Sequence, residues 1–227
     1  MRQFCLYWAG ILAAGVLVFG LAAGQGAAPE INAPYRNPNY EQWRKSFETE
    51  SREVYKERHA IVAAARVRPG MAVADVGAGT GLFTRLFAAQ VGAGGRVYAV
   101  DIALEFIAGN LNRARAAGHD NVVGIESTQD DTRLPAAALD LVFICDAYHH
   151  FEQPKAMLAS IRRALRPGGA LVVVDFERIP GVSPDWILKH VRAGKDEFRA
   201  EIEAAGFRLV EEVKLMRENY FLRFAKD

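Results

Sequence analysis

Cysteine pairs, runs of like charge and room for a second domain are all missing from this sequence. Of its two cysteines, Cys5 lies in an apolar N-terminal stretch, so Cys145 has no partner for an internal disulfide. The 28 basic and 27 acidic residues nearly cancel, and no Lys or Arg cluster forms the basic footprint of a nucleic-acid binder. At 227 residues the chain predicts one domain with a good-sized core, and neither DNA nor RNA is expected as a partner.

One long hydrophobic run is present, and it lies at the N-terminus. Residues 4–23 carry no charge and follow Arg2, the only charged residue before them. Small residues come next, so residues 1–26 are predicted to be either a secretory signal peptide, cleaved after Gly24 or Gly26, or an uncleaved anchor of the inner membrane. Both alternatives place the globular part on the outer side of that membrane, as an exported or membrane-associated protein.

The chain between this leader and the first strand is expected to lie over the rest of the domain. Residues 27–40 are rich in Pro and Asn and predict a linker or a strap over the domain. Residues 41–67 carry apolar side chains at helical spacing, which predicts one or two helices at the start of a domain over 41–227. The candidate lid residues of this segment are Trp43, Phe47, Tyr55 and Arg58.

Beyond Gly70 short apolar runs alternate with helical stretches, which predicts an α/β fold with a parallel sheet covered on both faces. The tail instead carries two strands in close succession, 207–213 and 219–224, which suit an antiparallel hairpin. We therefore expect a Rossmann-like, seven-stranded, mostly parallel sheet with an antiparallel edge strand. The first five strands are expected near 72–76, 96–100, 122–126, 139–144 and 170–175, with helices near 81–91, 103–117, 153–166 and 195–205.

A glycine-rich turn follows the first of these strands. Gly77, Gly79 and Gly81 alternate along the chain and permit positive φ and close approach of a ligand to the backbone. Asp101 ends the next strand about 20 residues later, the spacing at which a carboxylate accepts hydrogen bonds from a ribose. Together the turn and the acid predict a nucleoside ligand.

The details of the turn select among nucleosides. Dinucleotide sites read GxGxxG and hold a pyrophosphate, whereas this turn reads GxGxG and follows an acid, Asp75. A carboxylate there would repel phosphate and suit a positively charged amino group. S-adenosylmethionine combines a ribose with such an amino-acid tail, so it is the predicted cofactor, and a nicotinamide dehydrogenase is disfavoured.

At this point the chain resembles the class I S-adenosylmethionine-dependent methyltransferases, closest to the small-molecule group that includes the quinone-biosynthesis enzymes. Separated motifs over residues 50–227 carry the resemblance, among them Leu165-Arg-Pro-Gly-Gly169. The resemblance implies that Asp130 or its alternative Asp131, ahead of a Leu-Pro pair, bonds the adenine amino group. With these, the implied cofactor-binding set is Asp75, Gly77, Ala78, Gly79, Thr80, Gly81, Asp101, Ile102, Asp130, Asp131 and Asp146.

The fourth strand ends in a polar segment that the resemblance places beside the transferable methyl group. His149 is the candidate general base there, since imidazole titrates near neutral pH. Its alternative role is to shape the pocket. No metal is expected, because two adjacent histidines alone lack the further ligands that a closed site needs. The candidate substrate-binding residues are Tyr148, His150, His190 and Arg192.

Two functions of different class follow from these residues. The first is methyl transfer from S-adenosylmethionine to oxygen, carbon or nitrogen of a small acceptor. The alternative is a non-catalytic binding protein of the cell envelope that keeps the fold. The intact segment from Asp75 to Gly81 favours the enzyme, because a module freed from cofactor binding has no need of it. The acceptor and the oligomeric state do not follow from the sequence.

Overall fold

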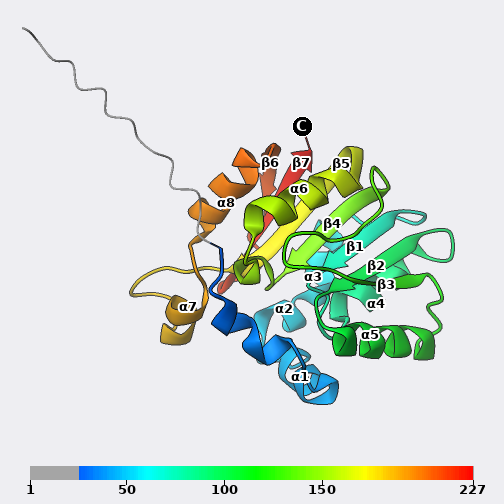
Figure 1. The fold of residues 1–227 in the computed structure, drawn as a ribbon, viewed down its shortest axis with the longest axis horizontal. Coiled ribbons are helices and arrows are strands. Elements are labelled where there is room, and N and C mark those ends of the chain that lie inside the picture. The colour runs from blue at the N-terminus through cyan, green and yellow to red at the C-terminus, as the bar shows by residue number, and fades with distance from the viewer. Residues whose placement is uncertain (1–25, 227) are drawn as a thin grey trace, which may run out of the picture.

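The computed structural model describes residues 26–226 and shows one seven-stranded sheet between two layers of helices (Figure 1). The predicted leader, residues 1–26, lies almost wholly outside this described part. Within it, no helix is long and apolar enough to cross a membrane. The strands run in the order β3-β2-β1-β4-β5-β7-β6. Their bounds are β1 Ala72–Val76, β2 Arg96–Asp101, β3 Val122–Glu126, β4 Leu139–Cys145, β5 Leu165–Phe176, β6 Phe207–Glu212 and β7 Asn219–Lys226.

The predicted α/β class is confirmed. Strands β1 to β5 pair in parallel, and β7 pairs antiparallel with both β5 and β6. The antiparallel strand therefore lies second from the edge, and β6 forms the edge itself. The helices of the domain are α4 Leu82–Val91, α5 Leu104–Ala116, α6 Pro154–Ala164, α7 Asp185–His190 and α8 Lys195–Ala204, with a short 3-10 helix η2 Tyr148–His150.

Alternate residues of each central strand belong to opposite faces, and each face carries a core of its own. On β1, Val73 packs with the helices α3 and α4, whereas Ala74 and Val76 pack with α6 and α8. Phe143 of β4 is fully buried on the first face, with its ring centroid 4.9 Å from that of Phe83. Burial on both faces explains why these strands read as continuous apolar runs.

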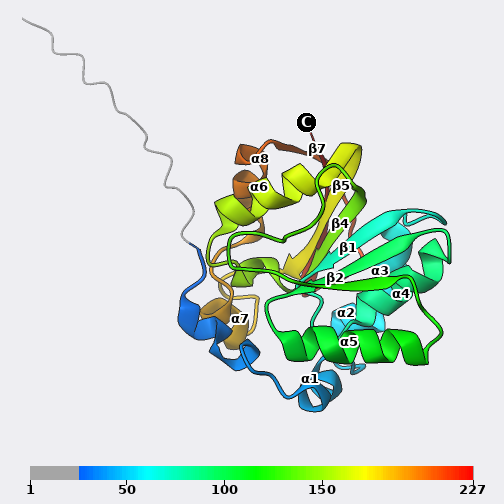
Figure 2. The ribbon, with the colours of Figure 1, turned by 45° about the vertical axis from the view of Figure 1, so that its right-hand side comes forward.

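The N-terminal segment is a strap rather than a free linker. It comprises η1 Pro29–Tyr35, α1 Tyr40–Phe47, α2 Glu53–Lys56 and α3 Arg58–Ala64. Figures 1 and 2 show its blue part passing beside α7 on the way to α1. The amide of Ala27 donates to the carbonyl of Phe151, and the Tyr40 hydroxyl donates to the carbonyl of Thr80 at 2.9 Å. These contacts place residues 27–40, predicted as linker or strap, directly over the carboxyl ends of the strands.

Glu48 ties this strap to the domain. Its side chain is 8% exposed and lies between Arg113 of α5, at 2.5 Å, and Arg85 of α4, at 3.1 Å. Burial alone would raise the pKa of Glu48, but hydrogen bonds and charge attraction from Arg113 and Arg85 outweigh it and lower the pKa. The Glu48 carboxylate therefore stabilises the fold at pH values above the ordinary pKa of a glutamate. That stabilisation is lost as the pH falls and the carboxylate is protonated.

We expect Glu48→Gln to lower the free energy of unfolding at pH 7 by about 1–3 kcal/mol, because two guanidinium groups lose their anion. Urea unfolding measures the change. Glu30→Gln, at an exposed carboxylate, is the matched control and should stay within about 0.5 kcal/mol of the parent. Equal stability of the two variants would show that Glu48 does not fasten the strap.

Candidate functional site

A cavity of about 520 Å³ opens at the carboxyl ends of the parallel strands. This is where the crossover topology of an open α/β sheet places ligands. The strap closes it on one side, with Asn32, Tyr35, Phe47 and Arg52 on its wall. Of the other predicted lid residues, Trp43, Tyr55 and Arg58 do not reach it, although Trp43 packs against Phe47 with ring centroids 4.9 Å apart.

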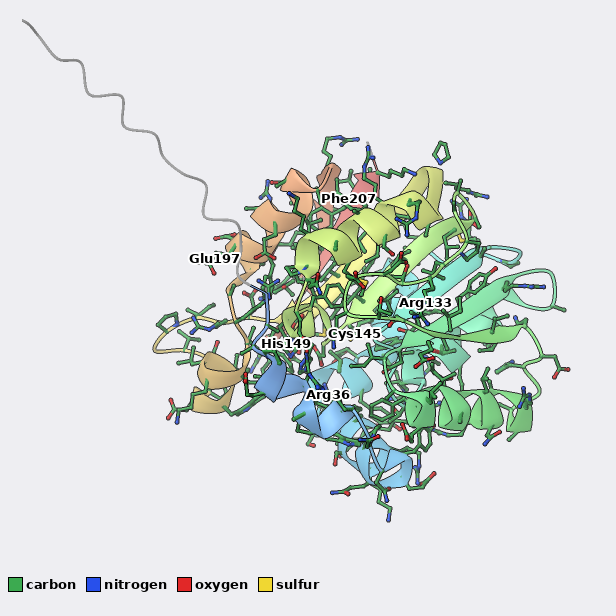
Figure 3. All side chains as sticks on the ribbon, viewed as in Figure 1. Arg36, Arg133, Cys145, His149, Glu197 and Phe207 are labelled. Atoms are coloured by element: carbon green, nitrogen blue, oxygen red, sulfur yellow. The ribbon has the colours of Figure 1, made fainter. Side chains whose placement is uncertain are left out.

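Most of the predicted residues meet at this cavity. Figure 3 shows His149 and Cys145 near the centre of the molecule, while Arg133 lies to one side. Of the predicted set, the cavity is lined by Asp75, Gly77, Ala78, Gly79, Thr80, Asp101, Ile102, Asp146, His149, His150 and His190. The remaining five, Gly81, Asp130, Asp131, Tyr148 and Arg192, do not line it.

The glycine turn has the geometry that its sequence predicts. Gly77, Gly79 and Gly81 all have positive φ, of 72°, 51° and 75°. A Cβ at Gly77 would lie 2.4 Å from that of Ala147, and one at Gly81 would lie 2.2 Å from the Asn110 amide oxygen. Gly77 thus keeps the turn against the end of β4. Gly81 faces helix α5 instead of the cavity, so its part in binding is to allow that packing.

Asp75 and Asp101 are both buried beneath this turn. The Thr84 hydroxyl donates to Asp75 Oδ2 at 2.7 Å, and the amides of Gly79 and Ala103 donate to the carboxylate of Asp101 at 2.8 and 3.1 Å. Burial raises the pKa of each from its usual 3.8 to about 6, although these hydrogen bonds oppose the rise. Two buried carboxylates facing one cavity make it a site for a cationic or hydroxyl-rich ligand.

The predicted adenine acids are placed differently. Asp130 is exposed and accepts from the Thr128 hydroxyl at 2.6 Å. Asp131 accepts from Arg163 at 2.8 Å and from Ser160 at 3.2 Å. Neither residue lines the cavity. The cavity wall is made instead by the residues just before the two acids, Ser127, Thr128 and Gln129. These residues directly follow the third strand, and that position could have indicated them from the sequence.

Asp146 lies at the tip of β4 under the strap. It forms an ion pair with Arg52, and the Asn219 amide donates to its other oxygen at 2.7 Å. Burial raises its pKa, while the charge of Arg52 lowers it. Neither Arg52 nor Asn219 could be predicted from the sequence, because both come from segments far away along the chain and only the fold brings them to this strand tip.

His149 is held against a buried carboxylate. Its Nδ1 lies 2.7 Å from Asp175 Oδ1, and its backbone amide donates to Asp175 Oδ2 at 3.1 Å. Both side chains are at most 1% exposed. Since a carboxylate accepts, Nδ1 carries the proton and Nε2 keeps its lone pair. Such a lone pair can take a proton from a bound acceptor or bind a metal ion.

Two further histidines stand beside it. The ring centroids of His149 and His150 are 4.2 Å apart, and His190 lies 5.1 and 5.0 Å from them. Burial lowers the pKa of His150 to about 2, and its histidine neighbours act in the same direction. Burial and His149 also lower the pKa of His190. Both rings are therefore neutral at physiological pH.

Tyr148 and Arg192 belong to the interior rather than to the substrate site. Tyr148 is fully buried, and its hydroxyl donates to Glu201 at 3.0 Å. Arg192 pairs with the same carboxylate at 2.7 Å and lies over the ring of Phe198. Their predicted role in substrate binding is therefore wrong. In η2 the chain turns Tyr148 into the core beside α8, whereas His149 and His150 line the cavity.

Comparison with known proteins agrees with this geometry. Residues 74–173 match the family model described as a methyltransferase domain. The chain is 32% identical over 120 residues to a ubiquinone/menaquinone biosynthesis C-methyltransferase of Cupriavidus metallidurans, covering 52% of this chain and 48% of that one. Its counterpart from Bordetella parapertussis is 30% identical over 159 residues, 68% of this chain and 60% of the relative. The chain thus spans about half to three-fifths of these relatives.

A solved structure of a SAM-dependent methyltransferase from Aquifex aeolicus superposes with a TM-score of 0.74 at 21% identity, over 84% of this chain and all of that one. The predicted Rossmann-like fold is thereby confirmed. Residues 74–173 thus resemble a methyltransferase domain, and the structural likeness shows the same fold.

Asp75→Asn tests the electrostatics of the site. Because the folded protein raises the pKa of Asp75 and Asp101 to about 6, it binds their protons more tightly than the unfolded chain, and stability falls as pH rises from 3.8 to about 6. The amide should raise the free energy of unfolding at pH 7 by on the order of 1–2 kcal/mol and flatten this fall. Urea unfolding across that pH range measures it, with the exposed Asp120→Asn as control. A slope identical to the parent's would contradict it.

Proposed function

We propose that this protein transfers a methyl group from S-adenosylmethionine to a small acceptor. The observation that carries the proposal is the cavity itself, which is lined by the glycine turn with Asp75 and Asp101 of β1 and β2, and by His149, which follows β4. The turn and the two acids suit the ribose and the cationic tail of the cofactor. The histidine end suits a nucleophile that must lose a proton.

In this reaction the protein itself forms no covalent bond with the cofactor or the acceptor. The sulfur–methyl bond of the cofactor breaks, its electron pair stays on sulfur, and a new bond forms between the methyl carbon and the acceptor. The protein aligns the two molecules, excludes water and takes the acceptor's proton. His149 Nε2 is the proposed proton acceptor, since Asp175 at 2.7 Å holds the ring and stabilises its charge once formed.

The acceptor is proposed to be small and partly apolar, with an ionisable oxygen, carbon or nitrogen nucleophile. Tyr35, Phe151, Met157, Phe176 and Trp186 line the cavity and would contact such a molecule. Two relatives are named as C-methyltransferases of ubiquinone/menaquinone biosynthesis, and a partly apolar acceptor from such a route would be compatible with this wall. The non-catalytic alternative gains no support, because the glycine turn and both acids remain open to the cavity.

Asp101→Ala should weaken binding of S-adenosylmethionine by about 10–100-fold, the loss expected for a hydrogen bond to a charged group. Isothermal titration calorimetry at pH 7.5 measures it, with Asp120→Asn as matched control. Parent protein should bind this cofactor and give no heat with NAD. Equal affinity of Asp101→Ala and parent would remove the ribose assignment, and silence with both ligands would favour the non-catalytic alternative.

His149→Ala should leave cofactor affinity within about threefold of the parent and slow turnover by about 10²–10⁴-fold, the usual contribution of acid–base catalysis. The measurement is transfer of a labelled methyl group to an acceptor found by screening extracted metabolites and lipids. His119→Ala, remote from the cavity, should behave like the parent. Unchanged turnover of His149→Ala would show that the imidazole only shapes the pocket.

A further inference from the structure

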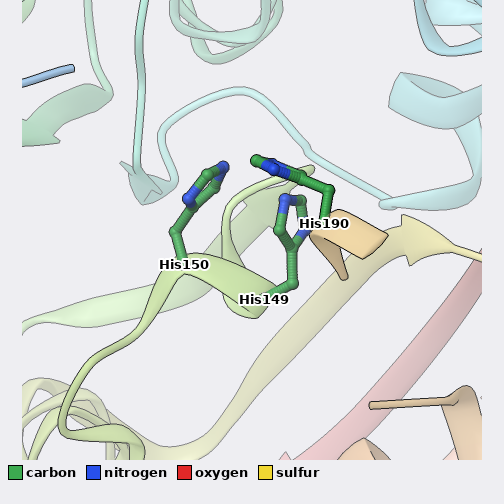
Figure 4. A group of neighbouring side chains, drawn as sticks. All are labelled: His149, His150 and His190. Atoms are coloured by element: carbon green, nitrogen blue, oxygen red, sulfur yellow. The ribbon is translucent and has the colours of Figure 1, made fainter. Parts of the chain in front are cut away.

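Three histidines from two distant parts of the chain converge on one point of the cavity wall. His149 and His150 belong to η2, at the end of β4, and His190 is the last residue of α7. One ring nitrogen of each lies within 4.8 Å of the other two, and Figure 4 shows the three rings turned toward one another. The sequence argument against a metal was the lack of a further ligand, and the fold supplies one.

The hydrogen bonds of His149 leave its inner nitrogen free. Asp175 accepts from the backbone amides of His149 and Phe176, at 3.1 and 2.8 Å, and so acts as an acceptor toward the ring as well. Nδ1 at 2.7 Å therefore carries the proton, and Nε2 carries the lone pair. A carboxylate behind the ring in this way orients metal-binding histidines and makes them more basic.

The same arrangement recurs at His150 with an amide in place of the acid. The Asn32 amide nitrogen donates to the carbonyl of His150 at 3.0 Å and to Glu152 at 2.8 Å, which fixes the direction of the side chain. Its oxygen, 2.8 Å from His150 Nδ1, must then accept. Nδ1 again carries the proton, and Nε2 again presents a lone pair.

His190 completes the group from the opposite side. Within residues 26–226 its ring nitrogens have no hydrogen-bond partner. Its helix is nevertheless fixed, because Ile187 is fully buried and Arg178 donates to the carbonyl of Leu188 at 2.9 Å. A half-buried, neutral imidazole on an anchored helix can turn toward an ion without disturbing the core.

We propose that His149, His150 and His190 bind one divalent transition-metal ion of the zinc class, with a fourth position open to the cavity. Three imidazoles and an open position are the ligand set of a catalytic zinc site. Zinc–nitrogen bonds of about 2.0–2.1 Å require the nitrogens to lie about 3.4 Å apart, so the nitrogens, now within 4.8 Å of one another, must approach by up to about 1.4 Å.

The consequence for catalysis rests on the proposed function. An acceptor oxygen or nitrogen that occupies the fourth position would lose its proton more readily, because a bound cation lowers the pKa of its ligands. The lone pair of His149 cannot hold an ion and a proton together, so with the ion bound the acceptor's proton would pass to solvent water, and His149 would act as the base only in the metal-free protein. The acceptor class then narrows to molecules with a metal-binding oxygen or nitrogen.

Cobalt(II) titration of the tag-free, chelator-treated full-length protein tests the site. We expect about one ion per chain with the intense visible bands of a four-coordinate ion, displaced by zinc. His190→Ala should weaken affinity more than about 100-fold, and Asp175→Asn by about 10–100-fold. Circular dichroism confirms that each variant is folded, and His190, at the cavity edge, is the safer of the two to replace.

His59→Ala, at an exposed histidine, is the matched control and should bind cobalt like the parent. No cobalt binding by the parent, equal binding by His190→Ala, or loss of binding in His59→Ala would each overturn the proposal. Cofactor affinity of the metal-free protein, measured in parallel, separates the two hypotheses. If the protein binds S-adenosylmethionine but does not bind cobalt, the metal site alone is refuted. If it binds cobalt but does not bind S-adenosylmethionine, only the proposed function is refuted.

Discussion

The structure depends on one constraint: parallel strands bring several buried acids to the same edge of the sheet. Asp75, Asp101, Asp146 and Asp175 lie at the carboxyl ends of the neighbouring strands β1, β2, β4 and β5, and all four side chains are less than a tenth exposed. Buried carboxylates repel one another and need donors. A hydroxyl, backbone amides, a guanidinium group and an imidazole satisfy them in turn. Much of the site therefore consists of the groups that donate hydrogen bonds to these acids or pair with their charge.

That constraint also explains why the strap is part of the site. Arg52 is drawn to the acid at the end of β4, and Asn32 binds both the backbone and the ring of His150. Glu48 anchors the same segment on α4 and α5. The wall over the cavity is therefore held by polar contacts to the groups beneath it, while the hydrophobic cores lie on the two faces of the sheet.

The sequence predicted what depends on neighbours along the chain. The sheet class, the glycine turn and the acids at the ends of β1 and β2 are local patterns, and the structure places them as expected. It missed what depends on tertiary contact. Hydrophobic periodicity cannot predict that Tyr148 lies in the core while His149 lines the cavity. It also cannot predict that Asp131 pairs with Arg163. The pairing of Asn32 with a residue 118 positions away has no local signature at all.

The contact of Asn32 with His150 has a practical consequence for protein engineering. Trimming the chain back to its first strand would keep the glycine turn and the strands of the sheet, but it would remove Val54, Ile61, Ala65 and Val67 from one of the two cores. It would also delete the groups that orient one imidazole and neutralise the acid at the end of β4. A minimal domain chosen from the family boundary at residue 74 would thus be expected to fail as a catalyst for reasons unrelated to its cofactor loop.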